Sequence, residues 1–127
     1  MRVLCGADIV EIGRMERVMT ASARFAEKVF TRVEIGYCES KKSRKYESYA
    51  ARFAAKEAVL KALGTGMSAG VAFTEIEVEN DARTGTPAIN LSGKAAGIFS
   101  EMGCTSLSVS LSHTSANALA TVVLLCE

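Results

Sequence analysis

The sequence contains no tryptophan, only one proline and one histidine, and aromatic residues make up 6% of its 127 residues. So few aromatic side chains weigh against a surface on which nucleic-acid bases stack. The formal net charge at pH 7 is only +1, so the chain as a whole has no electrostatic preference for nucleic acid or for an anionic membrane. We therefore expect neither nucleic acid nor a membrane among its partners.

Long hydrophobic runs are also missing. The longest, ALATVVLL at residues 118–125, is far shorter than the roughly 20 residues that a membrane-spanning helix needs. Near the N-terminus, Asp8 interrupts the apolar residues too early for the core of a secretory signal. No C-x-x-C pair occurs among the four cysteines, which are Cys5, Cys38, Cys104 and Cys126. One histidine and widely spaced cysteines argue against structural zinc, and we expect a cytoplasmic protein with reduced thiols.

The composition is that of a folded protein, with 49% hydrophobic and 23% charged residues. The length fits one domain, which we assign to residues 1–127. Helical spacing dominates the first half, and strand-like alternation dominates the second half. This order predicts an α+β fold in which a long alanine-rich helix packs on an antiparallel sheet.

Individual elements follow from periodicity and from turn residues. Residues 106–113, SLSVSLSH, alternate strictly, and residues 118–125 are apolar on both faces, which is typical of a central strand. The expected helices are residues 8–19, 22–30, 49–63 and 92–103, and the other expected strands are residues 2–7, 72–80 and a segment that starts at Pro87. Gly64 is expected to end the alanine-rich helix as its C-cap.

The alanine-rich helix carries four charges, namely Arg52, Lys56, Glu57 and Lys61. Glu57 and Lys61 fall between a stripe of large apolar residues and a face of alanines, and Arg52 and Lys56 lie on the other flank of the large stripe. The helix therefore has no broad polar face to solvate these charges. Glu57 and Lys61 have the spacing of an ion pair worth about 0.2–0.5 kcal/mol. Partly desolvated charges also suit a site for a cation or an anionic ligand. The spacing alone leaves both interpretations open.

Asp8 and His113 are two further candidates. Asp8 follows an apolar segment with Glu11 three residues later, which is typical of a helix N-cap, but a carboxylate at a strand end is also typical of a site. His113 ends an alternating strand beside a polar turn. A lone histidine is more often structural than catalytic, and the pattern does not decide its role.

Three stretches together resemble a known family. GADIVEIGR at residues 6–14, RFAAKEAVLKALGTG at residues 52–66 and SLSVSLSH at residues 106–113 are similar to the holo-[acyl-carrier-protein] synthases. These are the small, stand-alone 4'-phosphopantetheinyl transferases. Their signature is an aspartate in G-x-D followed by F/W-x-x-K-E-x-x-x-K, and the matching residues here are Asp8, Phe53, Lys56, Glu57 and Lys61.

The resemblance implies transfer of phosphopantetheine from coenzyme A to a serine of an apo acyl carrier protein, with release of adenosine 3',5'-bisphosphate. It implies that Asp8 and Glu57 bind Mg²⁺, which prefers few carboxylates together with phosphate and water. Lys61 would contact a phosphate oxygen or relay a proton, and Glu57, through a metal-bound water, is the favoured base. The residues expected to contact coenzyme A are Arg52, Lys56, Lys61, Gly64, Thr65 and His113, with Lys42, Arg44 and Lys45 as further candidates.

The resemblance also implies a homotrimer with active sites between subunits. The strand at residues 118–125 and the alanine face of residues 51–62 are the surfaces expected to pack between subunits. Arg14 and Arg24, in a locally basic region, are expected to dock the acidic carrier protein. Two alternatives remain: a non-enzymatic binding module, which metal dependence would exclude, and one half of a larger synthase.

Overall fold

The computed structural model describes residues 1–64 and 69–127. It confirms an α+β fold with two antiparallel sheets. The strands are β1 (Arg2–Glu11), β2 (Ile76–Asn80), β3 (Pro87–Leu91), β4 (Cys104–His113) and β5 (Asn117–Cys126). The α-helices are α1 (Ile12–Ala21), α2 (Phe25–Val29), α3 (Arg32–Glu39), α4 (Lys45–Leu63) and α5 (Gly93–Glu101), and short 3-10 turns occupy Lys42–Arg44 and Phe73–Glu75.

Strand β5 is the central strand of the larger sheet, whose order is β1-β5-β4. This confirms the prediction made from its two apolar faces. Its even-numbered residues are buried from Ala118 to Cys126, whereas odd-numbered residues face the other side and Val123 remains 44% exposed. Residues 1–64 and 69–127 therefore cover one face of this sheet and leave the other face open.

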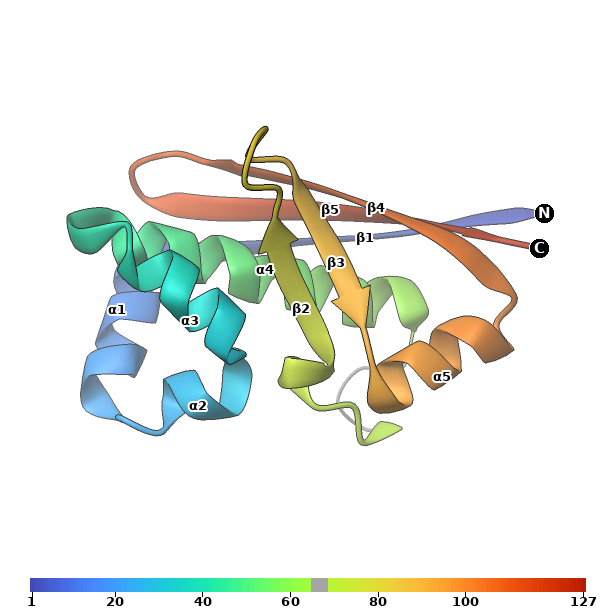
Figure 1. The fold of residues 1–127 in the computed structure, drawn as a ribbon, viewed down its shortest axis with the longest axis horizontal. Coiled ribbons are helices and arrows are strands. Elements are labelled where there is room, and N and C mark those ends of the chain that lie inside the picture. The colour runs from blue at the N-terminus through green and yellow to red at the C-terminus, as the bar shows by residue number, and fades with distance from the viewer. Residues whose placement is uncertain (65–68) are drawn as a thin grey trace.

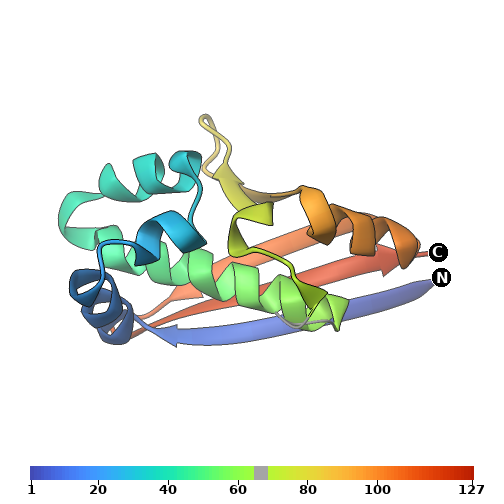
Figure 2. The ribbon, with the colours of Figure 1, turned by 90° about the horizontal axis from the view of Figure 1, so that it is seen from below.

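Helix α4 covers that face of the sheet along most of its length (Figures 1 and 2). On the other side of α4 lie the β2–β3 hairpin and helices α2 and α3. Although α4 is 19 residues long, no helix in the described residues is long and apolar enough to cross a membrane. The long helix is instead the buried centre of a three-layered arrangement.

The alanines of α4 allow the helix to approach β1 closely. A Cβ atom at Gly6 would lie 2.1 Å from the carbonyl oxygen of Ala58, so only glycine fits at this point of the strand. Ala54, Ala55 and Ala58 are completely buried. The predicted packing of the alanine-rich helix on the sheet is confirmed, and the sheet belongs to the same chain. The expectation that the alanine face packs between subunits is therefore wrong, because the chain's own sheet covers it.

The position of Asp8 differs from the expected helix start. Strand β1 continues to Glu11, which pairs with Asn117 across the sheet, and α1 begins at Ile12. Asp8 therefore lies inside a strand and is not an N-cap. The helical spacing of Ile9, Ile12 and Met15 is overridden at its start because β5 offers a hydrogen-bonding partner along ten residues.

The remaining boundaries differ by a few residues. Helix α4 begins at Lys45, four residues before the expected start, and β2 begins at Ile76 because the preceding residues form a 3-10 turn. Pro87 begins β3, as predicted. The Glu75 carboxylate accepts a hydrogen bond from the backbone N–H of Ala95 at 3.1 Å, so this turn satisfies the start of α5.

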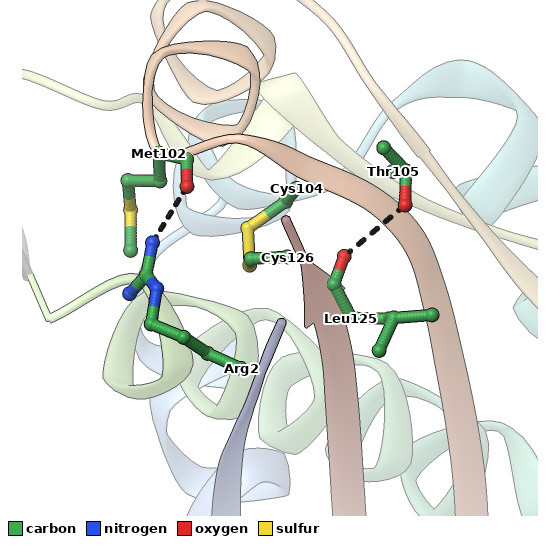
Figure 3. Close-up of a disulfide and its surroundings, with 6 residues drawn as sticks. All are labelled: Arg2, Met102, Cys104, Thr105, Leu125 and Cys126. Carbon is green, nitrogen blue, oxygen red and sulfur yellow. Dashed lines mark hydrogen bonds between the residues drawn. A yellow bond between two sulfur atoms is a disulfide. The ribbon is translucent and has the colours of Figure 1, made fainter.

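The cysteines correct another expectation. Strand register places Cys104 of β4 opposite Cys126 of β5, and the two form a disulfide (Figure 3). The expectation of reduced thiols is thus wrong for this pair, because spacing along the chain does not reveal cross-strand register. Nearby, Arg2 donates a hydrogen bond to the Met102 carbonyl at 2.6 Å, so the ends of all three strands are tied together (Figure 3). Cys5 and Cys38 are free.

Candidate active site

A cleft of about 360 Å³ lies beside β1, between α1 and α4. We call it the carboxylate cleft. Two residues singled out from the sequence, Asp8 and Glu57, both line it, the first from β1 and the second from α4. The full lining is Asp8, Ile9, Val10, Glu11, Arg14, Met15, Val18, Phe25, Phe53 and Glu57. The cleft therefore combines carboxylates at one part with an apolar wall at another.

Lys61 completes this group. Its Nζ lies 3.0 Å from Asp8 Oδ1 and donates a second hydrogen bond to the Ala7 carbonyl at 3.0 Å. Asp8 is 19% exposed and Lys61 is 55% exposed at the side chain. The ion pair recorded for Lys61 is thus with Asp8 on the strand, and not the pair with Glu57 that helical spacing allowed. The contact joins α4 to β1 at Asp8, one of the residues that line the cleft.

The electrostatics of Glu57 are unusual for a carboxylate. Partial burial raises its pKa, the negative charge of Asp8 raises it further, and Lys61 opposes both effects. Asp8 and Glu57 thus repel one another across the cleft, and a cation between them would relieve that repulsion. This arrangement gives the cleft the electrostatic character of a cation site.

The donor set suits a particular kind of cation. In the described part of the chain, no group of three His, Cys, Asp or Glu residues is close enough to hold a metal ion. Two carboxylates without a nitrogen or sulfur ligand suit a hard cation such as Mg²⁺, which keeps water and substrate oxygens in its other positions. The residues therefore fit the Mg²⁺ that the sequence resemblance implies.

A second pocket, of about 240 Å³, lies at the opposite edge of the sheet, where β4 ends. We call it the basic pocket. Its lining is Tyr37, Lys41, Arg44, Glu47, Ser48, Ala51, Arg52, Asn80, Leu111, Ser112 and His113. Three residues expected to contact coenzyme A, Arg44, Arg52 and His113, meet here. Lys45 instead pairs with Glu39 at 3.4 Å, and Lys42 is not part of the lining.

His113 lies at the mouth of the basic pocket and its side chain is half-exposed. Its Nε2 is 3.3 Å from the Glu47 carboxylate, and its Nδ1 is 3.4 Å from the Thr114 carbonyl. The structure thus gives the ring a fixed orientation towards the pocket. It leaves the expected contact with coenzyme A as a prediction.

Lys56 does not reach either pocket. It is completely buried, and its ammonium donates hydrogen bonds to Glu34 Oε1 at 2.8 Å, to the Phe73 carbonyl at 3.0 Å and to the Ile76 carbonyl. Burial lowers the pKa of Lys56, and the Glu34 carboxylate opposes that effect. With three donors and three acceptors, the ammonium is saturated. This geometry contradicts the prediction that Lys56 binds a coenzyme A phosphate directly.

Glu34 is the partner that the sequence interpretation missed. It is fully buried, and besides Lys56 it accepts hydrogen bonds from the backbone N–H groups of Thr31 and Val78. Thr31 and Glu34 also form a capping box at the start of α3. The T-x-x-E spacing of a capping box was visible in TRVE, although its ion pair with a helix 22 residues away was not.

The remaining predicted residues lie at the margins of these sites. Gly64 has a left-handed backbone (φ 74°) and is the C-cap of α4, as predicted, whereas its contact with coenzyme A stays a prediction. Thr65 lies outside the described residues. Arg14 lines the carboxylate cleft, and the exposed Arg24 immediately precedes α2.

Comparison with known proteins places this geometry in a family. Residues 4–122 match the model of the 4'-phosphopantetheinyl transferase superfamily. The holo-[acyl-carrier-protein] synthase of Ruminiclostridium cellulolyticum is 52% identical over 125 residues, which cover 98% of this chain and 92% of the relative.

Solved structures agree. The holo-[acyl-carrier-protein] synthase of Helicobacter pylori in complex with coenzyme A is 33% identical, with a TM-score of 0.82 over 96% of this chain and 100% of that one. The ACPS–CoA complex of Chronobacterium ammoniagenes is 29% identical, with a TM-score of 0.87 over 100% of this chain and 99% of that one. The chain therefore belongs to the 4'-phosphopantetheinyl transferase superfamily and is a transferase.

Proposed function

We propose that this enzyme transfers the 4'-phosphopantetheine group from coenzyme A to a serine hydroxyl of an apo acyl carrier protein, in a Mg²⁺-dependent reaction. The observation that carries the proposal is the meeting of Asp8, Glu57 and Lys61 at the carboxylate cleft. The names of the similar proteins support the two substrates, since they include acyl carrier protein synthases and complexes with coenzyme A. Fatty-acid biosynthesis in the cytoplasm is the setting we propose, because both substrates are used there.

Asp8 and Glu57 are the residues that would hold the magnesium ion. When bound, Mg²⁺ would act as a Lewis acid and neutralise charge on the pyrophosphate of coenzyme A. Two carboxylates from different elements, one on β1 and one on α4, leave the other positions of an octahedral ion to water and substrate oxygens. Partial burial and then the negative charge of Asp8 raise the pKa of Glu57, and this uncompensated negative charge supports the assignment.

The reaction requires one bond to form and one to break. The serine oxygen attacks the phosphorus next to the pantetheine group, and the bridging oxygen of the pyrophosphate leaves with the electron pair of the broken P–O bond. The leaving group is adenosine 3',5'-bisphosphate. Glu57, acting through a water, is the base we propose for the serine proton, because its carboxylate lines the cleft while Lys61 pairs with Asp8.

Lys61 supplies positive charge to the same step. Its ammonium holds Asp8 at 3.0 Å and is more than half exposed, so it can also reach a phosphate oxygen of a ligand in the cleft. Charge that develops on the leaving phosphate would be stabilised by this group. Lys61 is therefore the second catalytic residue that we propose.

The phosphate of coenzyme A that lies outside the reacting pyrophosphate is assigned to the basic pocket, through Arg52, Arg44 and His113. Arg52 and Glu57 are five residues apart on α4, so their side chains leave the helix in directions that differ by about 140°. The two pockets also lie at opposite edges of the sheet, with β5 between them. Within one chain, α4 separates the phosphate-binding residues from the catalytic ones.

A homotrimer with active sites between subunits would resolve this separation, and we propose that assembly. A ring of three copies can bring the β4 edge of one chain beside the β1 edge of the next. The uncovered face of the sheet has apolar residues for such a contact, since Val3 and Ile9 are each 66% exposed. Sedimentation should show a trimer. Mixed trimers of inactive Asp8→Asn and inactive Arg52→Gln chains should recover activity, whereas independent sites within each chain would not.

Carrier-protein docking is assigned to the region around α1 and α2. Arg14 lines the carboxylate cleft. Arg24 is exposed and immediately precedes Phe25, which lines the same cleft. Acyl carrier proteins are acidic, and the small net charge of this chain means that attraction must come from such local groups. A carrier helix bound to Arg14 would bring its serine to the catalytic residues.

The direct test is to incubate the protein with an apo carrier protein, coenzyme A and Mg²⁺. The intact mass of the carrier should increase by one phosphopantetheine group. A carrier whose serine is replaced by alanine should gain no mass, and chelation of the metal should stop the reaction. No mass increase with several apo carriers would disprove the proposed function.

A further inference from the structure

Arg52 has an unusual environment for a residue in a ligand pocket. It is only 3% exposed, although it lines the basic pocket. Its guanidinium lies over the Tyr37 ring, with 4.1 Å between Cζ and the ring centroid. Nη1 donates a hydrogen bond to Ser48 Oγ at 3.0 Å, and Nη2 donates to Asn80 Oδ1. Three elements, α3, α4 and β2, thus fix one side chain.

These contacts constrain the guanidinium in different ways. Stacking on Tyr37 fixes the plane but allows rotation within it. Ser48 lies one turn earlier on the same helix, so its contact moves with α4. Asn80, at the end of β2, is the hydrogen-bond partner from outside the helix. It alone fixes the guanidinium relative to the β2–β3 hairpin.

Asn80 is itself held by the hairpin turn. Its Nδ2 donates a hydrogen bond to the Gly85 carbonyl at 2.9 Å, while its Oδ1 accepts from Arg52. Gly85 has a left-handed backbone, with φ 77°, and its N–H donates to the Asp81 carbonyl at 2.8 Å. The carboxamide provides an acceptor on one side and a donor on the other, so Asn80 meets both neighbours at once.

The contacts of Arg52 leave part of its donor set unused. A guanidinium has five N–H groups, and in the described part of the chain Nε has no hydrogen-bond partner although it is buried. An unpaired buried donor is costly unless a ligand or water satisfies it. The network therefore holds Arg52 in a conformation in which its Nε–H has no hydrogen-bond partner among the described residues.

We propose that Asn80 is a positioning residue for Arg52 and thereby determines how tightly the enzyme binds coenzyme A. The inference rests on the proposed function, in which Arg52 contacts a phosphate of coenzyme A. Asn80 does not need to touch the ligand. It orients the guanidinium towards the basic pocket before the ligand arrives, so that binding does not have to order a flexible side chain.

The test compares Asn80→Leu with Asn90→Leu. Asn90 lies on β3 of the same hairpin, and its side chain makes an exposed contact of 3.4 Å with Glu77. Asn80→Leu should weaken coenzyme A binding, measured by calorimetry without carrier protein, by about tenfold or more, because a hydrogen bond to a charged group is lost. KM for coenzyme A should increase in parallel, while kcat and KM for the carrier protein change less than about twofold. Asn90→Leu should bind like the wild type.

A second background separates positioning from a general structural role. In Arg52→Gln, the further change Asn80→Leu should have no additional effect on binding, because its influence passes through Arg52. Asn80→Asp, which keeps the size of the side chain, carries the test if Asn80→Leu does not fold. It should also weaken binding, because a carboxylate repels the Gly85 carbonyl and neutralises Arg52.

Normal coenzyme A binding by Asn80→Leu, or an equal loss in the wild-type and Arg52→Gln backgrounds, would overturn the inference. Failure of the proposed function is a different result. In that case the wild-type protein would transfer no phosphopantetheine group to any carrier, whatever Asn80 does to coenzyme A binding.

Discussion

Lys56 and Glu57 are consecutive residues of α4, yet the structure treats their charges in opposite ways. Lys56 is completely buried, with three acceptors for its three N–H donors, one of them the buried carboxylate of Glu34. Glu57 lies at a cleft, and its nearest charged neighbours include another carboxylate, Asp8, which raises its pKa. One charge is fully compensated within the fold, and the other is not.

This difference separates structural from catalytic charge. A buried ion pair whose donors and acceptors are all satisfied has no capacity left for a ligand, and its loss damages the fold. A carboxylate held beside a like charge gains from a cation or a proton that arrives from outside. Both residues belong to the same sequence motif, so the motif combines a requirement of the fold with a requirement of the reaction.

Lys56→Met should produce the largest effect and should act on stability. It would leave the buried Glu34 carboxylate without its cation, which costs about 3–5 kcal/mol. Thermal unfolding should show a Tm that is lower by on the order of 10 °C or more. The matched control is Lys61→Met on the same helix, whose exposed pair with Asp8 contributes little to stability. Equal stability of the two variants would mean that the buried pair is not structural.

Asp8→Asn and Glu57→Gln should act on turnover. Each removes one negative charge from the proposed cation site, and loss of one well-placed electrostatic stabiliser reduces the rate by on the order of a hundredfold or more. Circular dichroism should show folded proteins, and the carrier mass assay should show the loss. Glu101→Gln, at the exposed end of α5, is the control and should keep wild-type activity. A near-normal rate of either cleft variant without added metal would contradict the metal assignment.

Much of the fold could be predicted, because it follows from local patterns. Two apolar faces identified β5 as the central strand, and Gly64 and Pro87 marked the end of α4 and the start of β3. The continuation of β1 to Glu11 could not be predicted from its own residues, since helical spacing there competes with ten residues of pairing to β5. The Cys104–Cys126 disulfide depended on register in the same way.

The candidate site shows the same limit. The resemblance to a family predicted that Asp8, Glu57 and Lys61 meet. Spacing alone did not, since it also allowed a simple ion pair between Glu57 and Lys61. The partners of the buried charges were not expected. Glu34 is 22 residues from Lys56, and Asn80 is 28 residues from Arg52, so only the tertiary structure brings them together. A charge on an apolar face predicts that a partner exists but does not identify it.

Arg14→Glu should have a smaller effect, confined to the carrier protein. Arg14 belongs to neither class of charge above, since it lines the cleft without a recorded salt bridge in the described residues. Reversing its charge should raise KM for the carrier protein several-fold and flatten its dependence on salt, because steering by surface charges is screened by ions. Coenzyme A binding and kcat should not change. Weaker coenzyme A binding in calorimetry would instead assign Arg14 to the nucleotide site.

The smallest expected effect is on the pH dependence of stability, and it tests whether the charge of Glu57 is uncompensated within the fold. The folded protein raises the pKa of Glu57 above its unfolded value, so between the two pKa values the folded state binds more protons than the unfolded state. Stability must therefore fall as pH rises through this window. Once the pH exceeds both values, the cost of holding an ionised Glu57 partly buried and beside Asp8 is fully present. Glu57→Gln removes that cost, so in metal-free buffer it should unfold at a higher temperature than the wild type at pH 7. This difference in unfolding temperature should shrink as pH falls towards the ordinary pKa of a carboxyl.

The control variant Glu101→Gln should show no such trend. A Glu57→Gln protein that is less stable than the wild type at pH 7 would show that Glu57 is compensated within the fold, as Lys56 is.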